Sequence, residues 1–440
     1  MDRPPQRALS LPHVGGPLPV NRNAPDVLHC DLNAAFARAE QQAMQLWRGK
    51  PLGVTPVVSP GGCIISPSYE LKAEGVKTAM RIREARLMSP NMILKQSNPP
   101  LYREIHRRFC RLFRDYSPDV VPKSIDEAVI FLRGTPALKK RSIEDIGQEI
   151  KERVKREIGP WMLVNIGIGT NAFLAKTAAG LHKPDGLDRI DHTNLRDVYA
   201  GLTLTDLCGI NTRYEARLNA AGILTPLEFL DADPGLLMRE VFHSVEGFYW
   251  YRKLRGYEAE TFEHERRTYG NSVTLGGPVT DVTSLLGILW MLSQKASVRM
   301  RRDGYSCRTV QVMLRYQDFT HFRHHYTLDT PVSTVGEVFR TVVRSFNRQR
   351  GRDERNNAVP VGKVSVDLYN LDAGSAAQQS LFVGEEVARD RRVTEALDAV
   401  NSRYGAFCLK SALMVGVEKH VWDRIAFGSV QDLEELYSDT

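Results

Sequence analysis

The sequence lacks any long apolar run, which excludes a protein with membrane-spanning helices. In 440 residues no stretch approaches the ~18 consecutive apolar residues that such a helix needs. The N-terminal residues also lack the charged-then-apolar pattern of a secretory signal. We therefore expect a cytoplasmic protein with no membrane partner.

Cysteine is scarce and scattered. The six cysteines form no CxxC pair and have no histidine at zinc-ligand spacing. They are Cys30, Cys63, Cys110, Cys208, Cys307 and Cys408. This pattern argues against disulfides and structural zinc, so we expect any metal ion to be held by oxygen ligands.

Acidic residues are scarce in one segment only. Residues 266–372 hold 16 lysines and arginines against 9 aspartates and glutamates, whereas the rest of the chain holds 43 of each. The net charge of +7 therefore comes from this segment. Such a segment is typical of a module that binds a phosphate backbone, although a merely soluble basic domain would give the same count.

The N-terminal segment is poor in aliphatic residues. Residues 1–25 carry six prolines, so we expect a flexible tail, with structure beginning at Val27. The whole chain of 440 residues is 42% hydrophobic and 25% charged, and it is long enough for roughly three or four globular domains.

Apolar periodicity predicts an α/β layer after the tail. Val27–Leu32 reads as a buried strand and is followed by a helix from Ala34 to about Leu46. The other predicted elements of this layer are helices at 100–116, 142–157 and 171–181 and strands at 128–132 and 163–168. Residues 191–262 are predicted to form a small all-helical unit.

The basic segment alternates strand and helix patterns. The predicted order is Ser272–Leu275, Thr283–Arg301, Cys307–Tyr316, His321–Leu328, Val335–Asn347 and Gly362–Leu371. This βαββαβ order predicts a four-stranded sheet with two helices on one face. Beyond residue 384 only one amphipathic helix is evident, at Arg391–Arg403.

Three carboxylates stand near strand ends. Asp31 ends the first buried strand, and Asp126 and Glu127 begin another. Buried carboxylates are costly unless they bind a cation or are solvated. Because adjacent strand residues point to opposite faces, Asp126 and Glu127 can converge only at a bend. Taken alone, an Asp-Glu pair most often has a structural or solvent-facing role.

The segments around these carboxylates resemble the two acidic motifs of Y-family DNA polymerases. The motifs read DLNAAFARAE at 31–40 and SIDEA at 124–128. Similar stretches follow in the family's order: YELK at 69–72 before Gly75-Val76, GIGTN at 167–171, LAK at 174–176 and KPDG at 183–186. Together they span residues 26 to about 190, and the chain resembles the bacterial translesion polymerases of the DinB/UmuC type.

The resemblance implies an α+β multidomain fold shaped like a right hand. The expected parts are a ferredoxin-like palm (26–36 and 100–190), small fingers (37–99), a helical thumb with a helix-hairpin-helix (191–262), a linker (263–269), a βαββαβ little finger (270–372), a clamp-binding peptide (373–383) and a C-terminal extension (384–440). It implies a monomer that binds primer-template DNA and deoxynucleoside triphosphates.

The resemblance also implies a two-metal site. Asp31 and Asp126 would bridge two Mg²⁺ ions, with Mn²⁺ as an alternative, and the backbone carbonyl of Leu32 would add a ligand. Glu127 would serve the ion that activates the primer 3′-hydroxyl. Hard oxygen ligands suit Mg²⁺, which clamps the attacking and leaving oxygens in phosphoryl transfer.

By the same resemblance, Tyr69, Lys72 and Lys183 would contact the triphosphate, and the ring of Phe36 would exclude ribonucleotides. Two positions depart from the family. Lys72 stands where arginine is usual, which keeps the charge but loses the bidentate fork. Ala35 stands where an aromatic residue is usual, which opens space beside the sugar gate.

Three further features suggest contacts with DNA and with a sliding clamp. Gly209 and Asn211 lie in a segment similar to a helix-hairpin-helix, for which a plain helical turn is the alternative. Asn211 stands where a second glycine is common, and asparagine tolerates a positive φ better than most residues. In the basic domain we expect phosphate contacts from Arg299, Arg301, Arg302, Arg308 and Arg315 as a group. QQSLF at 378–382 resembles the clamp-docking peptide, with Gln378, Leu381 and Phe382 as contacts, and a partly buried loop is the alternative.

Two other functions remain open at this point. One is a polymerase-like scaffold that binds DNA and the clamp without synthesis, which Ala35 and Lys72 favour and the intact carboxylates oppose. The other is a nucleotide cyclase built on a similar palm, which would have no use for the hairpin, the basic domain or the clamp-like peptide. No segment resembles a proofreading exonuclease. The sequence therefore predicts a DNA polymerase of translesion synthesis.

Overall fold

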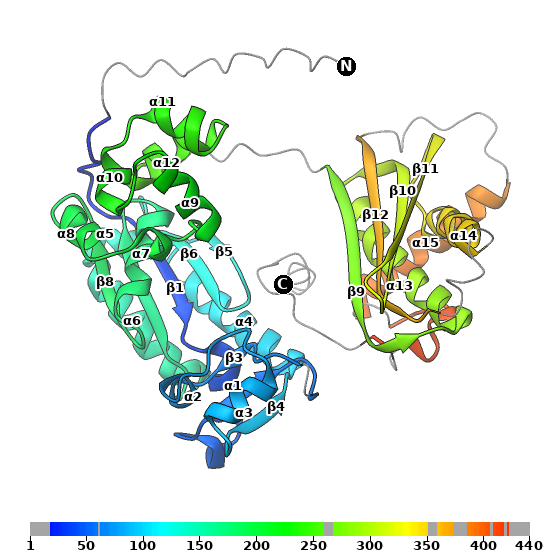
Figure 1. The fold of residues 1–440 in the computed structure, drawn as a ribbon, viewed down its shortest axis with the longest axis horizontal. Helices are drawn as coiled ribbons and strands as arrows, with labels where there is room; N and C mark the ends of the chain where they lie inside the picture. The colour runs from blue at the N-terminus through cyan, green and yellow to red at the C-terminus, as the bar shows by residue number, and fades with distance from the viewer. Residues whose placement is uncertain are drawn as a thin grey trace. The chain divides into compact units, whose positions relative to one another are not determined.

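The computed structural model describes residues 18–59, 62–258, 267–350, 359–373, 385–404, 408–417 and 420–421. The chain divides into two compact units, the first ending at Phe262 and the second beginning at Glu263. Figure 1 shows the helices and strands of both units.

A five-stranded sheet forms the centre of the first unit. Its strands are β1 (Val27–Leu32), β5 (Val120–Pro122), β6 (Glu127–Phe131), β7 (Val164–Gly169) and β8 (Leu187–Ile190), in the order β5-β6-β1-β7-β8. The central strand β1 is antiparallel to both β6 and β7. Strands β6 and β7 confirm the strands predicted at 128–132 and 163–168.

Helices cover both faces of this sheet. Helix α7 (Ala172–Leu181) packs directly on the backbone of β7, where a Cβ atom at Gly167 would lie 1.9 Å from the carbonyl oxygen of Ala175. Gly167 therefore permits a close approach that no other residue allows. Helices α4 (Pro99–Arg114) and α6 (Ile143–Arg153) cover the opposite face.

Alternation along β1 decides which side chains meet α7. His29 pairs in register with Gly167, and Asp31 pairs with Glu127 on β6. Because register partners of antiparallel strands point to the same face, His29, Asp31 and Glu127 all point toward the α7 side. The chain then turns sharply at Ala34, which has a left-handed φ of 45°, into α1 (Ala35–Ala43).

A second, smaller sheet lies at one end of the first unit. It contains β3 (Ser66–Pro67), β2 (Leu52–Thr55) and β4 (Ile93–Gln96), in that order, together with α2 (Tyr69–Ala73) and α3 (Ile82–Met88). Ile64, Leu71 and Ile82 form its core. The sequence analysis did not predict these strands, because two to four residues are too few to show a periodic pattern.

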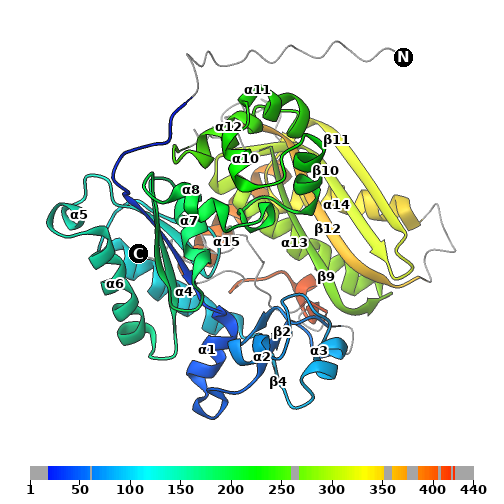
Figure 2. The ribbon, with the colours of Figure 1, turned by 60° about the vertical axis from the view of Figure 1, so that its left-hand side comes forward.

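The other end of the first unit is helical, as expected. It contains α8 (Leu195–Ala200), α9 (Thr212–Ala220), α10 (Pro226–Asp231), α11 (Pro234–Leu236) and α12 (Glu246–Leu254). Aromatic side chains fill its core, with Phe229 and Trp250 at a centroid distance of 5.5 Å. Both ribbon views show these helices and the small sheet at opposite ends of the unit, with β1 between them (Figures 1 and 2).

Residues 18–25 correct one expectation. The composition placed them in a flexible tail, but they run along the helical end and make specific contacts. The backbone N–H of Leu18 donates to the hydroxyl of Tyr251 at 2.8 Å. Asn21 pairs through its backbone with Arg255 and through its side chain with Gly256. Proline-rich sequence needs no periodic pattern to dock on an existing apolar core.

The second unit confirms the predicted βαββαβ order. Its elements are β9 (Thr268–Val279), α13 (Val282–Arg302), β10 (Tyr305–Tyr316), β11 (His321–Val332), α14 (Val335–Arg350) and β12 (Val361–Ala373). The antiparallel sheet has the order β11-β10-β12-β9, and α13 and α14 pack on one face. A further helix, α15 (Glu385–Tyr404), extends beyond the predicted Arg391–Arg403. Among the described helices, none is both long and apolar enough to cross a membrane.

Candidate active site

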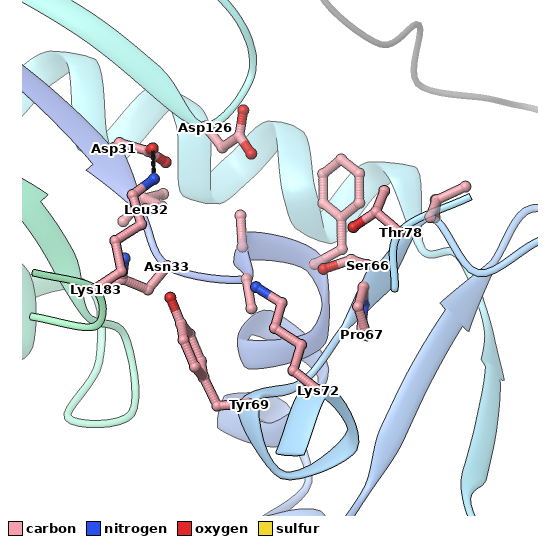
Figure 3. A pocket seen from close by; sticks show the side chains of 14 residues that line it. Asp31, Leu32, Asn33, Ser66, Pro67, Tyr69, Lys72, Thr78, Asp126 and Lys183 are labelled. Carbon is pink, nitrogen blue, oxygen red and sulfur yellow. Dashed lines mark hydrogen bonds and ion pairs between the residues drawn. The ribbon is translucent and has the colours of Figure 1, made fainter. Parts of the chain in front are cut away.

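A pocket opens where β1 ends and α1 begins. Its lining comes from β1, the turn into α1, the small sheet, α2 and the loop after α7 (Figure 3). The residues that line it are Asp31, Leu32, Asn33, Ala34, Ala35, Phe36, Ile65, Ser66, Pro67, Tyr69, Lys72, Thr78, Asp126 and Lys183. Most of the residues predicted for metal, triphosphate and sugar contacts therefore share one cavity.

A bend brings Asp126 into this pocket. The backbone N–H groups of Lys123 and Ser124 both donate to the carbonyl oxygen of Glu127, which closes a tight turn before β6. The carbonyl of Asp126 then accepts from the N–H of Leu32 at 2.9 Å. Asp126 thus escapes strict strand alternation and lies beside Asp31 in the pocket, as Figure 3 shows.

Glu127 takes a different position. Its Oε2 atom lies 3.2 Å from Nε2 of His29 and 2.7 Å from Nζ of Lys176 on α7. Burial would raise the pKa of Glu127, but the hydrogen bonds from His29 and Lys176 lower it to about 2. Glu127 does not line the pocket, and within the described ranges no group of three or more His, Cys, Asp or Glu side chains is placed to hold a metal ion.

Asp126 is in an anionic environment. Burial raises the pKa of its carboxyl, the hydrogen bond from the hydroxyl of Ser124 at 2.5 Å opposes that shift, and the charges of Asp31 and Glu127 raise it further. A cation in the pocket would relieve this repulsion. Mg²⁺ is commonly bound through one or two carboxylates plus substrate phosphates, so Asp31 and Asp126 fit such an ion.

The opposite wall of the pocket is cationic. Lys183 forms an ion pair with Asp31, and Lys72 lies with its Nζ 4.4 Å from the ring centroid of Tyr69. Figure 3 shows the side chains of Lys72 and Tyr69 pointing into the pocket from α2. All three predicted triphosphate contacts are therefore neighbours. The pocket combines carboxylates on one side with cations on the other.

The loop that carries Lys183 is fixed by two buried asparagines that the sequence analysis missed. The Oδ1 atom of Asn33 accepts from the N–H of Asp185 at 2.8 Å. Asn165, fully buried on β7, donates to the carbonyl of His182 at 3.0 Å and accepts from the N–H of Gly186 at 3.1 Å. Asn165 pairs in register with Asp31. This register is known only from the structure, so the sequence alone did not mark Asn165 as part of the site.

The ring of Phe36 is held by stacking. Phe36 and Tyr102 lie with ring centroids 4.5 Å apart and planes 16° from parallel. The hydroxyl of Tyr102 donates to Glu40 at 2.7 Å. Phe36 is only 6% exposed, yet it lines the pocket, so core packing and a sugar-facing role are compatible. The small side chain of Ala35 lies beside it.

The predicted hairpin segment has a different local geometry from the one expected. Gly209 has a φ of 102°, as a tight turn requires, but Asn211 has a φ of −97°. Asn211 does not replace glycine in a left-handed conformation. It caps α9 instead, because its Oδ1 accepts from the N–H groups of Arg213 and Tyr214, both at 3.0 Å.

The predicted DNA-contacting arginines of the second unit do not form one group. Arg299 is 7% exposed and donates to the carbonyl of Gly270, and Arg301 makes a two-oxygen ion pair with Asp398 on α15. Arg308 pairs with Asp372, and Arg302 lies near Asp303. Arg302 at the end of α13 and Arg315 on β10 are exposed. Because Arg299 and Arg301 are bonded inside the unit, we do not propose them as DNA contacts.

The open face of this sheet carries cations that the sequence analysis did not single out. Arg315 pairs in register with Lys363, and Met313 pairs with Arg323. Register partners face the same side, so Arg315, Arg323 and Lys363 lie opposite the apolar face that α13 and α14 cover. Only the strand register, which composition cannot give, identifies this set. The clamp-like residues Gln378, Leu381 and Phe382 lie outside the described residues.

Comparison with known proteins identifies the family. Residues 30–180 match the impB/mucB/samB family model, and residues 266–381 match the model of that family's C-terminal domain. The DNA polymerase IV of Pelotomaculum thermopropionicum is 31% identical over 397 residues, covering 88% of this chain and 94% of the relative. The DNA polymerase IV of Moorella thermoacetica is 30% identical over 388 residues, covering 86% of this chain and 93% of the relative.

Solved structures share the fold. A chimeric Y-family DNA polymerase superposes with a TM-score of 0.64 at 22% identity, covering 79% of this chain and 99% of that one. An insertion ternary complex of Dbh DNA polymerase gives a TM-score of 0.55 with the same identity and coverage. With the carboxylate and cationic walls of the pocket, these matches show that the chain belongs to the bacterial, DinB-like branch of the Y family of DNA polymerases.

Proposed function

We propose that this DNA polymerase of translesion synthesis adds deoxynucleotides to a primer in the pocket formed by Asp31, Asp126 and Lys183. One observation carries the proposal: two carboxylates from distant segments share a cavity with three cationic or phenolic groups. Carboxylates suit metal-assisted attack, and the cations suit a triphosphate. A cyclase would use the same pocket but not the second unit.

As a family member the protein depends on a divalent metal. We propose two Mg²⁺ ions, or Mn²⁺, held by Asp31, Asp126 and the carbonyl of Leu32. Glu127 would join them after leaving His29 and Lys176. When bound, such ions make the primer 3′-hydroxyl a better nucleophile and neutralise charge on the leaving pyrophosphate.

The chain's own residues bind and orient the nucleotide. Lys183 would exchange its partner Asp31 for phosphate oxygens, and Lys72 and Tyr69 would hold the triphosphate from α2. The stacked ring of Phe36 would face the sugar and exclude a 2′-hydroxyl. These contacts align the α-phosphorus for attack, which is the main contribution that a protein makes to phosphoryl transfer.

The protein would bind primer-template DNA through its phosphate backbone, independently of the base sequence. We propose backbone contacts from the turn at Gly209 and Asn211 and phosphate contacts from the open sheet face with Arg315, Arg323 and Lys363. Arg302 and Arg308 would add contacts at the edge. We further propose that the protein works as a cytoplasmic monomer that docks on a sliding clamp through Gln378, Leu381 and Phe382.

Primer extension on a defined template with Mg²⁺ tests the proposal. We expect the parent protein to extend the primer with the templated base and Asp126→Ala to lose this activity. DNA binding without extension by the parent would favour the scaffold. Extension that Asp126→Ala leaves unchanged would refute the metal site.

The clamp contact has its own test. Leu381→Ala combined with Phe382→Ala is expected to abolish clamp-stimulated synthesis while basal extension stays unchanged, because apolar anchors concentrate the binding energy. Equal stimulation of the double variant and the parent would rule the contact out.

A further inference from the structure

Arg38 is a buried cation behind the nucleotide pocket. It lies on α1 two residues after Phe36 and is 9% exposed, but it does not line the pocket. Its Nη1 atom donates to the carbonyl of Trp161 at 3.0 Å, and its Nε atom is buried without a partner. Burial lowers the pKa of Arg38 and the charges of Glu70, Tyr69 and Asp185 oppose that shift, but among the described residues no carboxylate forms an ion pair with it. Burying such a charge is costly.

The guanidinium lies between two aromatic rings from different parts of the first unit. Its central carbon is 5.5 Å from the ring centroid of Tyr69 and 5.6 Å from that of Trp161. Trp161 is itself fixed, since its Nε1 donates to Gln41 at 3.0 Å and its backbone N–H donates to Gln42 at 2.8 Å. Arg38 therefore ties the first residue of α2 to a rigid anchor before β7.

The charge of Arg38 also acts on Lys72, which lines the pocket. Burial lowers the pKa of Lys72, and the positive charges of Lys183 and Arg38 lower it further. Arg38 and Lys72 both lie over the ring of Tyr69. Lys183 lines the same pocket and is ion-paired with Asp31. The cations on this side of the pocket favour a polyanionic ligand.

We infer that Arg38 is a positioning residue for the triphosphate: from behind the pocket it holds the ring of Tyr69 against the Trp161 anchor. The inference rests on the proposed function, because it assumes that Tyr69 contacts a nucleoside triphosphate. If Arg38 served stability alone, its removal would change the melting temperature and not the nucleotide dependence.

Arg48 provides a matched control. Its guanidinium lies 5.7 Å from the Trp161 ring and donates to the carbonyls of Gln41 and Gln42. Among the described residues, the cations over the Tyr69 ring are Arg38 and Lys72, not Arg48. We expect Arg38→Met to raise KM for the incoming nucleotide about tenfold with kcat within about twofold of the parent. Arg38→Lys is expected to raise KM less, and Arg48→Met is expected to leave both constants within about twofold.

A double-variant cycle separates positioning from packing. Tyr69→Phe keeps the ring and Tyr69→Leu removes it. The effect of Arg38→Met on KM is expected to persist beside Tyr69→Phe and to fall below about twofold beside Tyr69→Leu. An unchanged KM in folded Arg38→Met, an equal rise in Arg48→Met, or additive effects with Tyr69→Leu would overturn the inference. If Arg38→Met does not fold, Arg38→Lys decides by the same criteria.

Nucleotide binding to a complex with a dideoxy-terminated primer is measured in parallel. It distinguishes a failure of the proposed function from a failure of the role inferred for Arg38. A parent that binds the templated nucleotide but does not extend a normal primer would overturn the proposed function and leave the role of Arg38 testable through affinity. Equal nucleotide affinity of the parent and Arg38→Met would overturn the inference alone.

Discussion

Lys183 and Asp31 are ion-paired in the pocket although 152 residues separate them in the sequence. The lysine comes from a loop fixed by Asn33 and Asn165, and the carboxylate comes from the end of the central strand. On the role proposed for Lys183, nucleotide binding would separate this pair.

This pair predicts the effect of Lys183→Met. Loss of a charged hydrogen bond to the triphosphate removes about 1.5–3 kcal/mol of binding, which raises KM for the nucleotide about 10–150-fold. Steady-state incorporation of one nucleotide measures this change. Lys139→Met, on exposed α5 (Pro136–Lys140), is the control and should match the parent. Similar KM values for the two variants would remove Lys183 from the triphosphate site.

The Glu127–Lys176 pair predicts a pH-dependent stability. Since the pKa of Glu127 is depressed from 4.5 to about 2, its partners stabilise the fold above about pH 4.5, and this contribution is lost as the pH falls toward 2. Lys176→Met is expected to lower the free energy of unfolding by about 1–2 kcal/mol at pH 7 and by much less near pH 2. Urea unfolding at several pH values measures the difference.

Arg196 is the control for that experiment. It pairs with Asp231 at 2.8 Å, but the two side chains are 59% and 56% exposed. Exposed pairs contribute little, so Arg196→Met should change stability by less than about 1 kcal/mol. A loss in Lys176→Met that stays constant down to pH 2 would contradict the assignment of the effect to Glu127.

The stacked pair of Phe36 and Tyr102 predicts the sugar selectivity. Phe36→Ala removes the ring from the pocket wall, so the preference for deoxynucleotides over ribonucleotides should fall at least about tenfold. Because Phe36 is buried, the same change should cost about 3 kcal/mol of stability. Tyr102→Phe keeps the stack and should keep the selectivity. Unchanged discrimination in folded Phe36→Ala would refute the gate.

The open sheet face of the second unit predicts the salt dependence of DNA binding. Arg315→Ala and Arg323→Ala should each reduce the slope of log K against log salt by about 0.7–0.9. Arg301→Ala should leave the slope unchanged and reduce stability, because its partner is Asp398. Fluorescence anisotropy at several salt concentrations measures the slopes. A reduced slope in Arg301→Ala alone would place the interface elsewhere.

The sequence predicted those features that depend on local pattern. Strand alternation and helical periodicity gave the βαββαβ unit and the main strands around Asp31, and motif order indicated the pocket residues. The short strands of the small sheet were missed because Leu52–Thr55 and Ser66–Pro67 show no period. The internal roles of Arg301 and Arg38 depend on partners that are distant in the sequence, Asp398 and Trp161.

The conformations of individual side chains could not be predicted from the sequence either, even where the backbone was predicted correctly. The bend at Asp126 could be stated as a requirement, but whether Glu127 would face the pocket or Lys176 depends on a rotamer and on the charge of α7. Asn211 illustrates the same limit, since it could adopt a left-handed conformation or cap a helix, and the structure has the cap.

Single-turnover incorporation of one templated nucleotide by Asp31→Asn and Asp126→Asn tests the central claim most directly. Both variants keep the shape of the side chain and remove its charge. We predict that each loses at least about a thousandfold in rate while still binding primer-template DNA, because two-metal chemistry needs both carboxylates. Rates within about tenfold of the parent in either variant would contradict the assignment of the reaction to this pocket.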